Sequence, residues 1–206
     1  MTWSDPAKVD EYVGRVGRLA PRLAGEAALV ELLPDAPDRV LDLGCGDGRL
    51  AALVLDARPS VTEVVAVDSS PAMLERARAR FADEPRVRVV EGDLADPIRA
   101  LGAFDVVVSG FAIHHLVDDR KVALVQEVFT QLRPGGVYAN LEVVASPTPE
   151  LHAEFRRAIE READDPEDRL VDVATQLGWM RDAGFAHVDC MWKWRGFALL
   201  AGRQKD

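Results

Sequence analysis

The residues from Val40 to Leu50, VLDLGCGDGRL, constrain the fold more than any other part of the chain. An apolar run typical of a buried strand leads directly into glycines at 44, 46 and 48, after which a helical pattern begins. Glycine allows a tight bend and lets a ligand approach the backbone without a Cβ clash. A strand that enters a helix through such a turn indicates an α/β fold, in which ligands bind at the carboxyl ends of the strands.

Two side chains beside this turn bear on which ligand it suits. The dinucleotide fingerprint G-x-G-x-x-G needs glycine at position 49, where this chain has Arg49, so a nicotinamide oxidoreductase is disfavoured. Asp42, two residues before the first glycine, favours a positively charged ligand over a pyrophosphate. S-adenosylmethionine carries a sulfonium and an ammonium group, and we therefore expect it as the cofactor, with S-adenosylhomocysteine as its product.

Short β-rich runs alternate with helical periodicity, which implies right-handed βαβ crossovers and a parallel sheet. We expect strands at 39–43, 63–67, 86–90, 104–109 and 137–144. We expect helices at 5–33 (divided at Pro21), 47–57, 70–81, 120–132, 150–162 and 171–183. The triplet Pro134-Gly135-Gly136 predicts a turn before the fifth strand. The last two strands, 186–192 and 196–201, are joined by a link too short for a parallel crossover and are expected to be antiparallel.

The length of 206 residues suits a single domain. We expect it to be organised as an N-terminal helical cap (1–34), a cofactor-binding core (35–144), a lid-like helical insertion (145–170), and a final helix with a closing β-hairpin (171–206).

The composition excludes several classes of protein. A net charge of −10 argues against a nucleic-acid surface, because phosphate contacts need clustered lysine and arginine. The sequence has no membrane-length apolar stretch and no secretory signal. Cys45 and Cys190 lack metal-site spacing, and no Asp/His cluster stands out. We expect a cytoplasmic protein with no membrane partner and no bound metal.

Two further acidic residues follow predicted strands. Asp68 ends the second strand and can accept hydrogen bonds from ribose hydroxyls, although an Asp before Ser-Pro is also a good helix cap. Asp93 follows the third strand and can accept a hydrogen bond from an adenine amine, although it could equally be a surface-loop residue.

Taken together, VLDLGCGDGRL, VVAVDSSPAML, VVEGDLAD, FDVVVSGFAIHHL and LRPGGVY resemble the class I S-adenosylmethionine-dependent methyltransferase family in order and spacing, over about residues 40–140. The resemblance implies a Rossmann-like, doubly wound α/β fold with a seven-stranded sheet of order 3-2-1-4-5-7-6 and strand 7 antiparallel. It also implies transfer of a methyl group from S-adenosylmethionine to a small molecule.

By position, the resemblance implies which residues would contact each part of the cofactor. The methionine part would be bordered by Asp42, Gly44, Cys45 and Gly46. The adenosine would contact Asp68, Ser69, Met73, Asp93 and Leu94. Near the methyl group would lie Ser109, Gly110 and Phe111 at the end of the fourth strand. Tyr12, in an N-terminal segment typical of pocket-capping helices, would touch the cofactor or the substrate.

The residues that would perform the chemistry are less strongly indicated. His114 and His115 follow the fourth strand, where an acceptor is expected, and His115 is our candidate general base. Such histidines more often cap the next short helix or pack structurally. Glu142, near the end of the fifth strand, is a second candidate for a residue of the substrate pocket. We expect, however, that its carboxylate is exposed beyond the edge of the sheet. We expect Trp179, Trp192 and Trp194 to pack rather than to bind a cationic amine.

Two other functions stay open. The tail AGFAHVDCMWKWRGFALL is loosely similar to the carboxy-S-adenosylmethionine synthases of tRNA wobble-uridine modification. A non-catalytic cofactor-binding protein would keep the same glycine turn. Neither the accepting atom nor the oligomeric state follows from the sequence, and a homodimer is one option.

Overall fold

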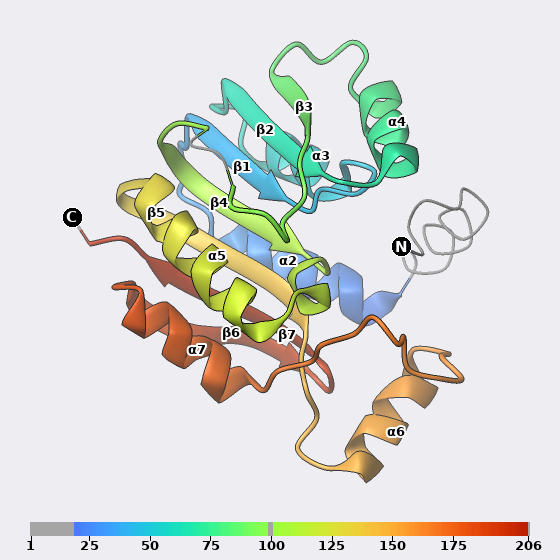
Figure 1. Ribbon diagram of the computed structural model, residues 1–206. Coiled ribbons are helices and arrows are strands. Elements are labelled where there is room, and N and C mark those ends of the chain that lie inside the picture. Colours follow the sequence, from blue (N-terminus) through green and yellow to red (C-terminus); the bar gives the residue numbers. More distant parts are fainter. Residues whose placement is uncertain (1–18, 99–100, 206) are drawn as a thin grey trace.

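The computed structural model describes residues 19–98 and 101–205. They form one seven-stranded sheet in the order β3-β2-β1-β4-β5-β7-β6, flanked by helices (Figure 1). The strands are β1 (Arg39–Leu43), β2 (Glu63–Asp68), β3 (Val87–Glu91), β4 (Phe104–Gly110), β5 (Leu132–Val143), β6 (Ala186–Trp194) and β7 (Phe197–Arg203). Strand β7 runs antiparallel to both β5 and β6, and the other pairings are parallel. This arrangement confirms the order expected from the sequence.

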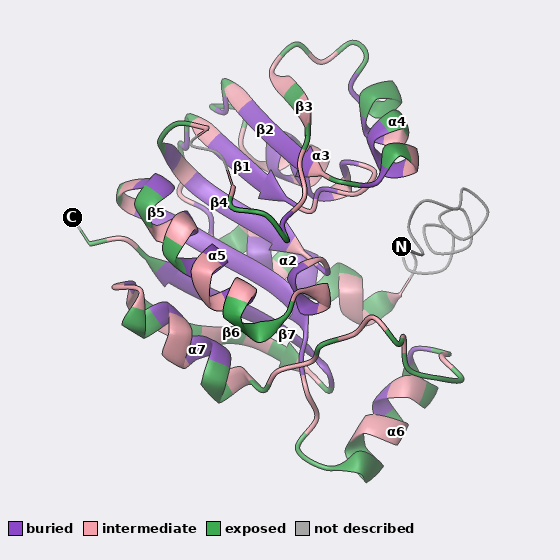
Figure 2. Cartoon of the chain, viewed as in Figure 1, coloured by how far each residue is buried: buried purple, intermediate pink, exposed green. Residues whose placement is uncertain are grey.

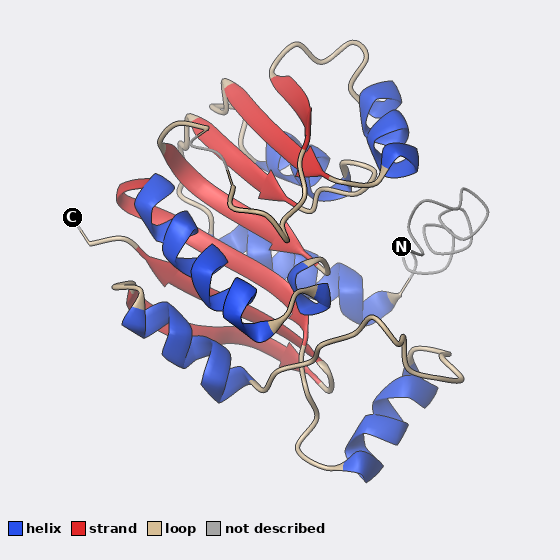
Figure 3. Ribbon diagram, viewed as in Figure 1, coloured by secondary structure: helices blue, strands red, loops and turns tan. Residues whose placement is uncertain are grey.

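The helices are α2 (Ala20–Leu32), α3 (Arg49–Ala57), α4 (Pro71–Arg80), α5 (Asp118–Gln131), α6 (Pro149–Ala158) and α7 (Val173–Asp182), with one 3-10 turn, η2 (Ile113–His115). The earlier part of the predicted helix 5–33 lies outside the described residues. Figure 3 shows how the helices cover the two faces of the sheet. None of the described helices has the length and apolar character needed to cross a membrane.

The central strands are buried on both faces, which explains their nearly continuous apolar runs (Figure 2). Alternate residues of β4 point to opposite sides of the sheet. Val106 and Val108 join a core cluster with Val54 of α3, whereas Val107 joins a second cluster with Leu124 of α5. All five side chains are fully buried, so the carboxyl ends of the strands are held rigidly.

The predicted turn at Pro134-Gly135-Gly136 is wrong, because these residues lie within β5. Phe104 of β4 pairs with Leu132 and Val106 pairs with Val137, so the triplet forms a bulge opposite a shorter stretch of β4. Gly135 adopts a φ of +74°, and its N–H donates to the Gln204 carbonyl. The amide of Gln204 donates back to the Gly136 carbonyl. These two bonds keep the chain in the sheet despite the proline.

The segment after α6 also differs from expectation. The predicted helix 150–162 covers Pro149–Ala158 only, and residues 159–172 are irregular. Thr148 caps α6 by accepting a hydrogen bond from the Leu151 amide, and Asp172 caps α7 by accepting from Thr175. Between the two helices the chain returns to the sheet, where the Arg169 amide donates to the His114 carbonyl at 2.9 Å. This return brings acidic residues to the carboxyl ends of the strands.

Candidate active site

A cavity of about 520 Å³ lies at the carboxyl ends of β1, β2 and β4. Its wall contains most of the residues expected from the sequence, namely Asp42, Gly44, Cys45, Gly46, Asp68, Ser69, Met73, Asp93, Leu94, Gly110, Phe111 and His115. Ser109 is not in this wall. It is fully buried, and its hydroxyl donates to the Leu43 carbonyl, which ties β4 to β1. Tyr12 lies outside the described residues.

The glycine turn needs glycine at each of its three positions. Gly44, Gly46 and Gly48 have φ angles of +68°, +55° and +82°, in the left-handed region that residues with a Cβ avoid. A Cβ on Gly44 would also lie 2.2 Å from the Cβ of Ala112. Glycine therefore allows the turn to approach η2 closely and to form part of the cavity wall.

Asp42 is a buried carboxylate with an unused oxygen. Its side chain is fully buried; Oδ2 accepts a hydrogen bond from the Ala51 amide, and Oδ1 has no hydrogen-bond partner among the described residues. Burial, reinforced by the charges of Asp68 and Asp47, raises the pKa of Asp42 to about 7 against the lowering effect of the Ala51 amide. Such a group suits a ligand cation, which would supply the missing partner.

The carboxylate of Asp68 holds the glycine turn against α4. Oδ2 accepts from the Gly46 amide and Oδ1 from the Ser70 amide, each at 2.8 Å. Burial raises the pKa of Asp68, although its backbone hydrogen bonds act in the opposite direction. The N-cap of α4 is Ser70 and not Asp68, since the Ser70 hydroxyl accepts from the Met73 amide. Asp68 therefore belongs to the cavity wall while it also orders the turn.

An ion cluster of two arginines and one glutamate, which the sequence analysis missed, completes one side of the cavity. Glu26 of α2 is only 5% exposed and accepts hydrogen bonds from both Arg49, at 2.8 and 2.7 Å, and Arg22, at 2.8 Å. Burial would raise the pKa of Glu26, but the two guanidinium groups hold it below its usual value. The Arg22 guanidinium lies over the Phe111 ring, 4.9 Å from its centre. The only sequence signal was the four-residue spacing of Arg22 and Glu26, because Arg49 meets Glu26 only through tertiary packing.

The expectation that Glu142 is exposed beyond the sheet edge is wrong. Glu142 lies within β5 opposite Ala198 of β7, and its side chain is 1% exposed. One oxygen is 2.5 Å from His114 Nδ1, and the other accepts from the His114 amide at 3.0 Å. Glu142 therefore ties His114 of η2 to the end of β5.

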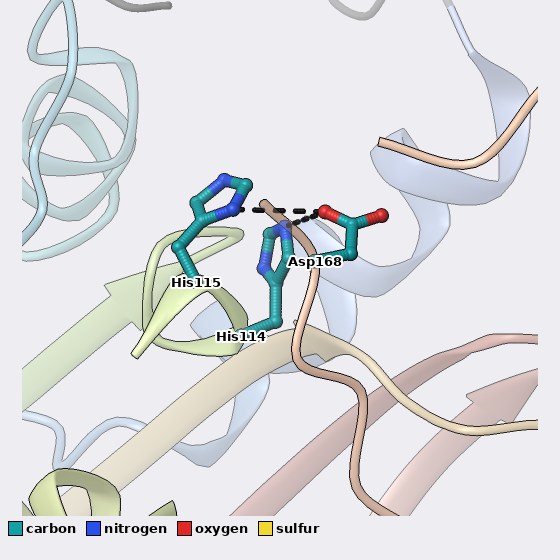
Figure 4. Close-up of side chains that lie close together, drawn as sticks. All are labelled: His114, His115 and Asp168. Carbon is teal, nitrogen blue, oxygen red and sulfur yellow. Dashed lines mark ion pairs between the residues drawn. The ribbon is translucent and has the colours of Figure 1, made fainter. Parts of the chain in front are cut away.

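Asp168, from the segment between α6 and α7, lies against both histidines (Figure 4). Its Oδ1 is 3.4 Å from His114 Nε2 and 3.6 Å from His115 Nδ1. Burial lowers the pKa of His114, but the carboxylates of Glu142 and Asp168 outweigh burial and raise it to about 9. Burial and the neighbouring His114 charge lower the pKa of His115. At neutral pH His114 is therefore an imidazolium, and His115 is neutral.

The same three side chains are close enough to share a cation, since donor atoms of His114, His115 and Asp168 lie within 4.8 Å of one another. This cluster could not be predicted from the sequence, because Asp168 is distant from the histidines along the chain. A metal would need a deprotonated nitrogen on each ring. His114 also lies between the carboxylates of Glu142 and Asp168, so ion pairing by itself can account for the cluster.

The three tryptophans within the described residues do not line this cavity. Trp192 and Trp194 pack against the core beneath α2 and α3, and Trp194 contacts the rings of Phe155 and Phe197. Trp179 is half-buried on α7 and does not line the cavity. Their packing matches the expectation from the sequence.

Comparison with known proteins identifies the family. A family model described as a methyltransferase domain matches residues 40–136. The carboxy-S-adenosyl-L-methionine synthase of Aeromonas hydrophila is 31% identical over 95% of this chain and 88% of that protein. The demethylmenaquinone methyltransferase of Clavibacter sepedonicus is 30% identical over 76% of this chain and 69% of that protein. The chain belongs to the class I S-adenosylmethionine-dependent methyltransferases.

The fold of this methyltransferase is shared with larger proteins. The structure of an O-methyltransferase family protein from Burkholderia thailandensis superposes with a TM-score of 0.75 at 23% identity. The match covers 97% of the methyltransferase and 59% of that chain, so the present chain spans a little over half of the larger protein. At this identity the likeness concerns the fold alone.

Proposed function

We propose that the methyltransferase binds S-adenosylmethionine in the 520 Å³ cavity and transfers its methyl group to a small-molecule acceptor held beside Phe111 and His115. The observation that supports this most is the buried carboxylate of Asp42, whose Oδ1 has no partner among the described residues. An ionised group in such a place is stable only beside a cation. The ammonium of the cofactor supplies one.

The remaining groups of the wall fit the rest of the cofactor. Asp68 retains lone pairs beyond those used by the Gly46 and Ser70 amides, and these can accept the ribose hydroxyls. The carboxylate of Asp93, next to the apolar side chain of Leu94, suits the amine edge and the face of adenine. Arg22 uses Nε for Glu26, and no other hydrogen bond of its guanidinium is found among the described residues. Its terminal nitrogens can pair with the cofactor carboxylate.

The acceptor is small because the cavity must hold the donor and the acceptor together. Its volume lies within the range of small-molecule sites, about 300–1,000 Å³. When bound, S-adenosylmethionine supplies an activated methyl group, so the chain's main task is to hold the acceptor atom in line with it. His115 lies in the same wall, which supports its proposed role in accepting a proton from the acceptor.

A second candidate function is carboxy-S-adenosylmethionine synthesis, which is the named activity of the relative from Aeromonas hydrophila. The specific observation in its favour is that this match spans 95% of the chain and extends beyond the cofactor-binding motifs. Mass spectrometry of the nucleoside separates the two, after incubation of the protein with S-adenosylmethionine together with candidate methyl acceptors or with candidate carboxyl donors. A demethylated nucleoside supports methyl transfer, and a carboxylated one supports the second candidate.

The proposal is tested by calorimetric titration of S-adenosylhomocysteine into the wild type, Asp68→Ala and the exposed control Asp83→Asn. Hydrogen bonds to a charged acceptor contribute about 1.5–3 kcal/mol, so Asp68→Ala should weaken binding by about 10- to 100-fold. The control should bind as the wild type does. Unchanged affinity in a folded Asp68→Ala variant would remove Asp68 from the cofactor site, and no binding to the wild type would refute the proposed function.

A further inference from the structure

The stretch Glu167-Asp168-Arg169, between α6 and α7, is fixed beside the cavity by its backbone. The Arg169 amide donates to the His114 carbonyl of η2 at 2.9 Å. The buried Lys121 of α5 donates through Nζ to the Arg169 carbonyl. Because η2 and α5 both hold this residue, its side chain leaves the backbone from a defined place at the edge of the cavity.

The three side chains of this stretch have different surroundings. Asp168 lies against His114 and His115 (Figure 4) and is not part of the cavity wall. Glu167 and Arg169 both belong to that wall. Glu167 is half-buried and Arg169 is exposed, so a ligand can reach both side chains. The stretch therefore presents one anion and one cation to the cavity.

Arg169 differs from the other arginines of the wall. Those three each have a carboxylate partner, namely Glu26 for Arg22 and Arg49, and Asp47 for Arg80. Arg169 has no carboxylate partner among the described residues, and its Nη1 donates instead to the carbonyls of Pro166, at 2.8 Å, and Asp168, at 3.1 Å. These two bonds orient the guanidinium group and leave Nε and Nη2 available. Two parallel N–H donors of this kind bind a carboxylate in bidentate fashion.

The carboxylate of Glu167 also has no ion pair or hydrogen bond among the described residues, although Arg169 is only two positions away. Its backbone amide donates to the Asp165 carboxylate at 3.0 Å, which fixes the turn that places the side chain. Asp165 in turn lies 3.6 Å from Arg161, so an acidic residue of the same segment does find a basic partner. The wall therefore holds two opposite charges that do not neutralise each other.

We propose that the methyl acceptor is a small zwitterion, such as an amino acid, whose carboxylate binds Arg169 and whose ammonium group binds Glu167. This inference rests on the proposed function and names the acceptor class of the same site. A zwitterion gives both side chains a partner, whereas a singly charged ligand would desolvate one of them without compensation. The apolar side chains of Phe111, Leu116 and Leu141 in the same wall suit the rest of the acceptor. Arg169 and Glu167 thus determine specificity and take no part in the transfer itself.

The charges are tested by calorimetry with three compounds of similar skeleton, titrated into the protein saturated with S-adenosylhomocysteine. Phenylalanine carries both charges, 3-phenylpropionate only the carboxylate, and phenethylamine only the ammonium group. Phenylalanine should bind about 10- to 100-fold more tightly than either of the other two, which is the effect expected of one charge-assisted contact.

Two variants assign each charge to its side chain. Arg169→Gln should abolish the preference for phenylalanine over phenethylamine and keep the preference over 3-phenylpropionate. Glu167→Gln should have the reverse effect, because it removes the partner of the ammonium group. The matched control Glu162→Gln removes an exposed carboxylate from the same segment and should leave all three affinities unchanged. The affinity for S-adenosylhomocysteine reports whether each variant is folded.

Glycine tests the two charges without a side chain. NMR of the arginine Nε–H groups, with Arg169→Gln to assign the signal, follows the guanidinium group directly. The Arg169 signal should shift when glycine is added, should shift less with acetate, and should not move with methylamine. A signal that neither glycine nor phenylalanine moves would overturn the inference.

Three other results would overturn it while the proposed function stands. The first is equal affinity for phenylalanine and the singly charged compounds. The second is an equal loss for all three compounds in Arg169→Gln or Glu167→Gln. The third is methyl transfer to acceptors without these charges at a kcat/KM no lower than that of zwitterionic acceptors. Failure of the wild type to bind S-adenosylhomocysteine would instead refute the proposed function.

Discussion

Replacing Asp42 by asparagine should make the cofactor-free protein more stable at pH 8 while it weakens cofactor binding. Asp42 is fully buried, and its pKa of about 7 lies well above the ordinary value of 3.8. A difference of that size corresponds to a penalty of about 4 kcal/mol for keeping the group ionised in the folded protein. Asparagine avoids this penalty, but its amide N–H groups would be buried without an assured partner, at a cost of about 1–3 kcal/mol. We therefore expect a net gain of about 1–3 kcal/mol.

The sign of the pH dependence follows from the direction of the shift. The folded protein holds the Asp42 proton more tightly than the unfolded chain, so this group lowers the free energy of unfolding as the pH rises from about 4 to about 7. Urea unfolding of the wild type and Asp42→Asn at pH 4.5 and pH 8 measures this directly. At pH 4.5, where Asp42 is protonated in the folded protein, the variant should have no advantage, and at pH 8 it should show the full advantage.

The exposed control Asp35→Asn makes the same change of charge on the surface and should show no such dependence. Calorimetry should find weaker S-adenosylhomocysteine binding in Asp42→Asn, because the buried anion that suits the ammonium is gone. The reasoning would be refuted by an Asp42→Asn variant that is no more stable than the wild type at pH 8, or by an advantage that does not vary with pH.

Two further predictions concern stability. Gly44→Ala places a Cβ 2.2 Å from the Cβ of Ala112 at a φ of +68°, and should lower the free energy of unfolding in urea by at least about 2 kcal/mol and abolish S-adenosylhomocysteine binding. The control Gly178→Ala in α7, with open space around it, should be neutral or stabilising. Equal effects of the two substitutions would contradict the strain argument. Glu26→Gln leaves the guanidinium groups of Arg22 and Arg49 without their shared anion and should lower the free energy of unfolding by about 2–4 kcal/mol at pH 7. The exposed control Glu31→Gln should leave the free energy of unfolding almost unchanged. Because the pKa of Glu26 is lowered in the folded protein, this stabilisation is present above its unfolded pKa of about 4.5 and is lost as the pH falls through its folded value. The stability cost of Glu26→Gln should therefore shrink toward that of Glu31→Gln as the pH is lowered.

The part of the cavity that we propose for the cofactor could be predicted from the sequence because its residues depend on local rules. Each lies at a strand end or in the turn that follows, and parallel strands bring their carboxyl ends to one edge of a sheet. Asp42, Gly44 and Asp68 were located in this way, and the structure places all three in one wall. The sheet order followed from the family resemblance and the short closing link, and the structure confirms it.

Other features depended on contacts between residues far apart along the chain. Pro134-Gly135-Gly136 has the local chemistry of a turn, yet its bonds to Gln204 keep it within β5. In the sequence, Arg49 served only to exclude the dinucleotide fingerprint, which needs glycine at that position. The structure shows its contact with Glu26, which the sequence did not reveal.

The sequence by itself determined the strand-turn-helix motif, the acidic residues at the strand ends and the methyl donor that they suit. Only the tertiary structure decided how His114 and His115 are charged, because Glu142 and Asp168 reach them from β5 and from the segment after α6. The protonation of an imidazole depends on burial and on charges a few ångströms away. These depend on the folded chain, and residue spacing does not reveal them.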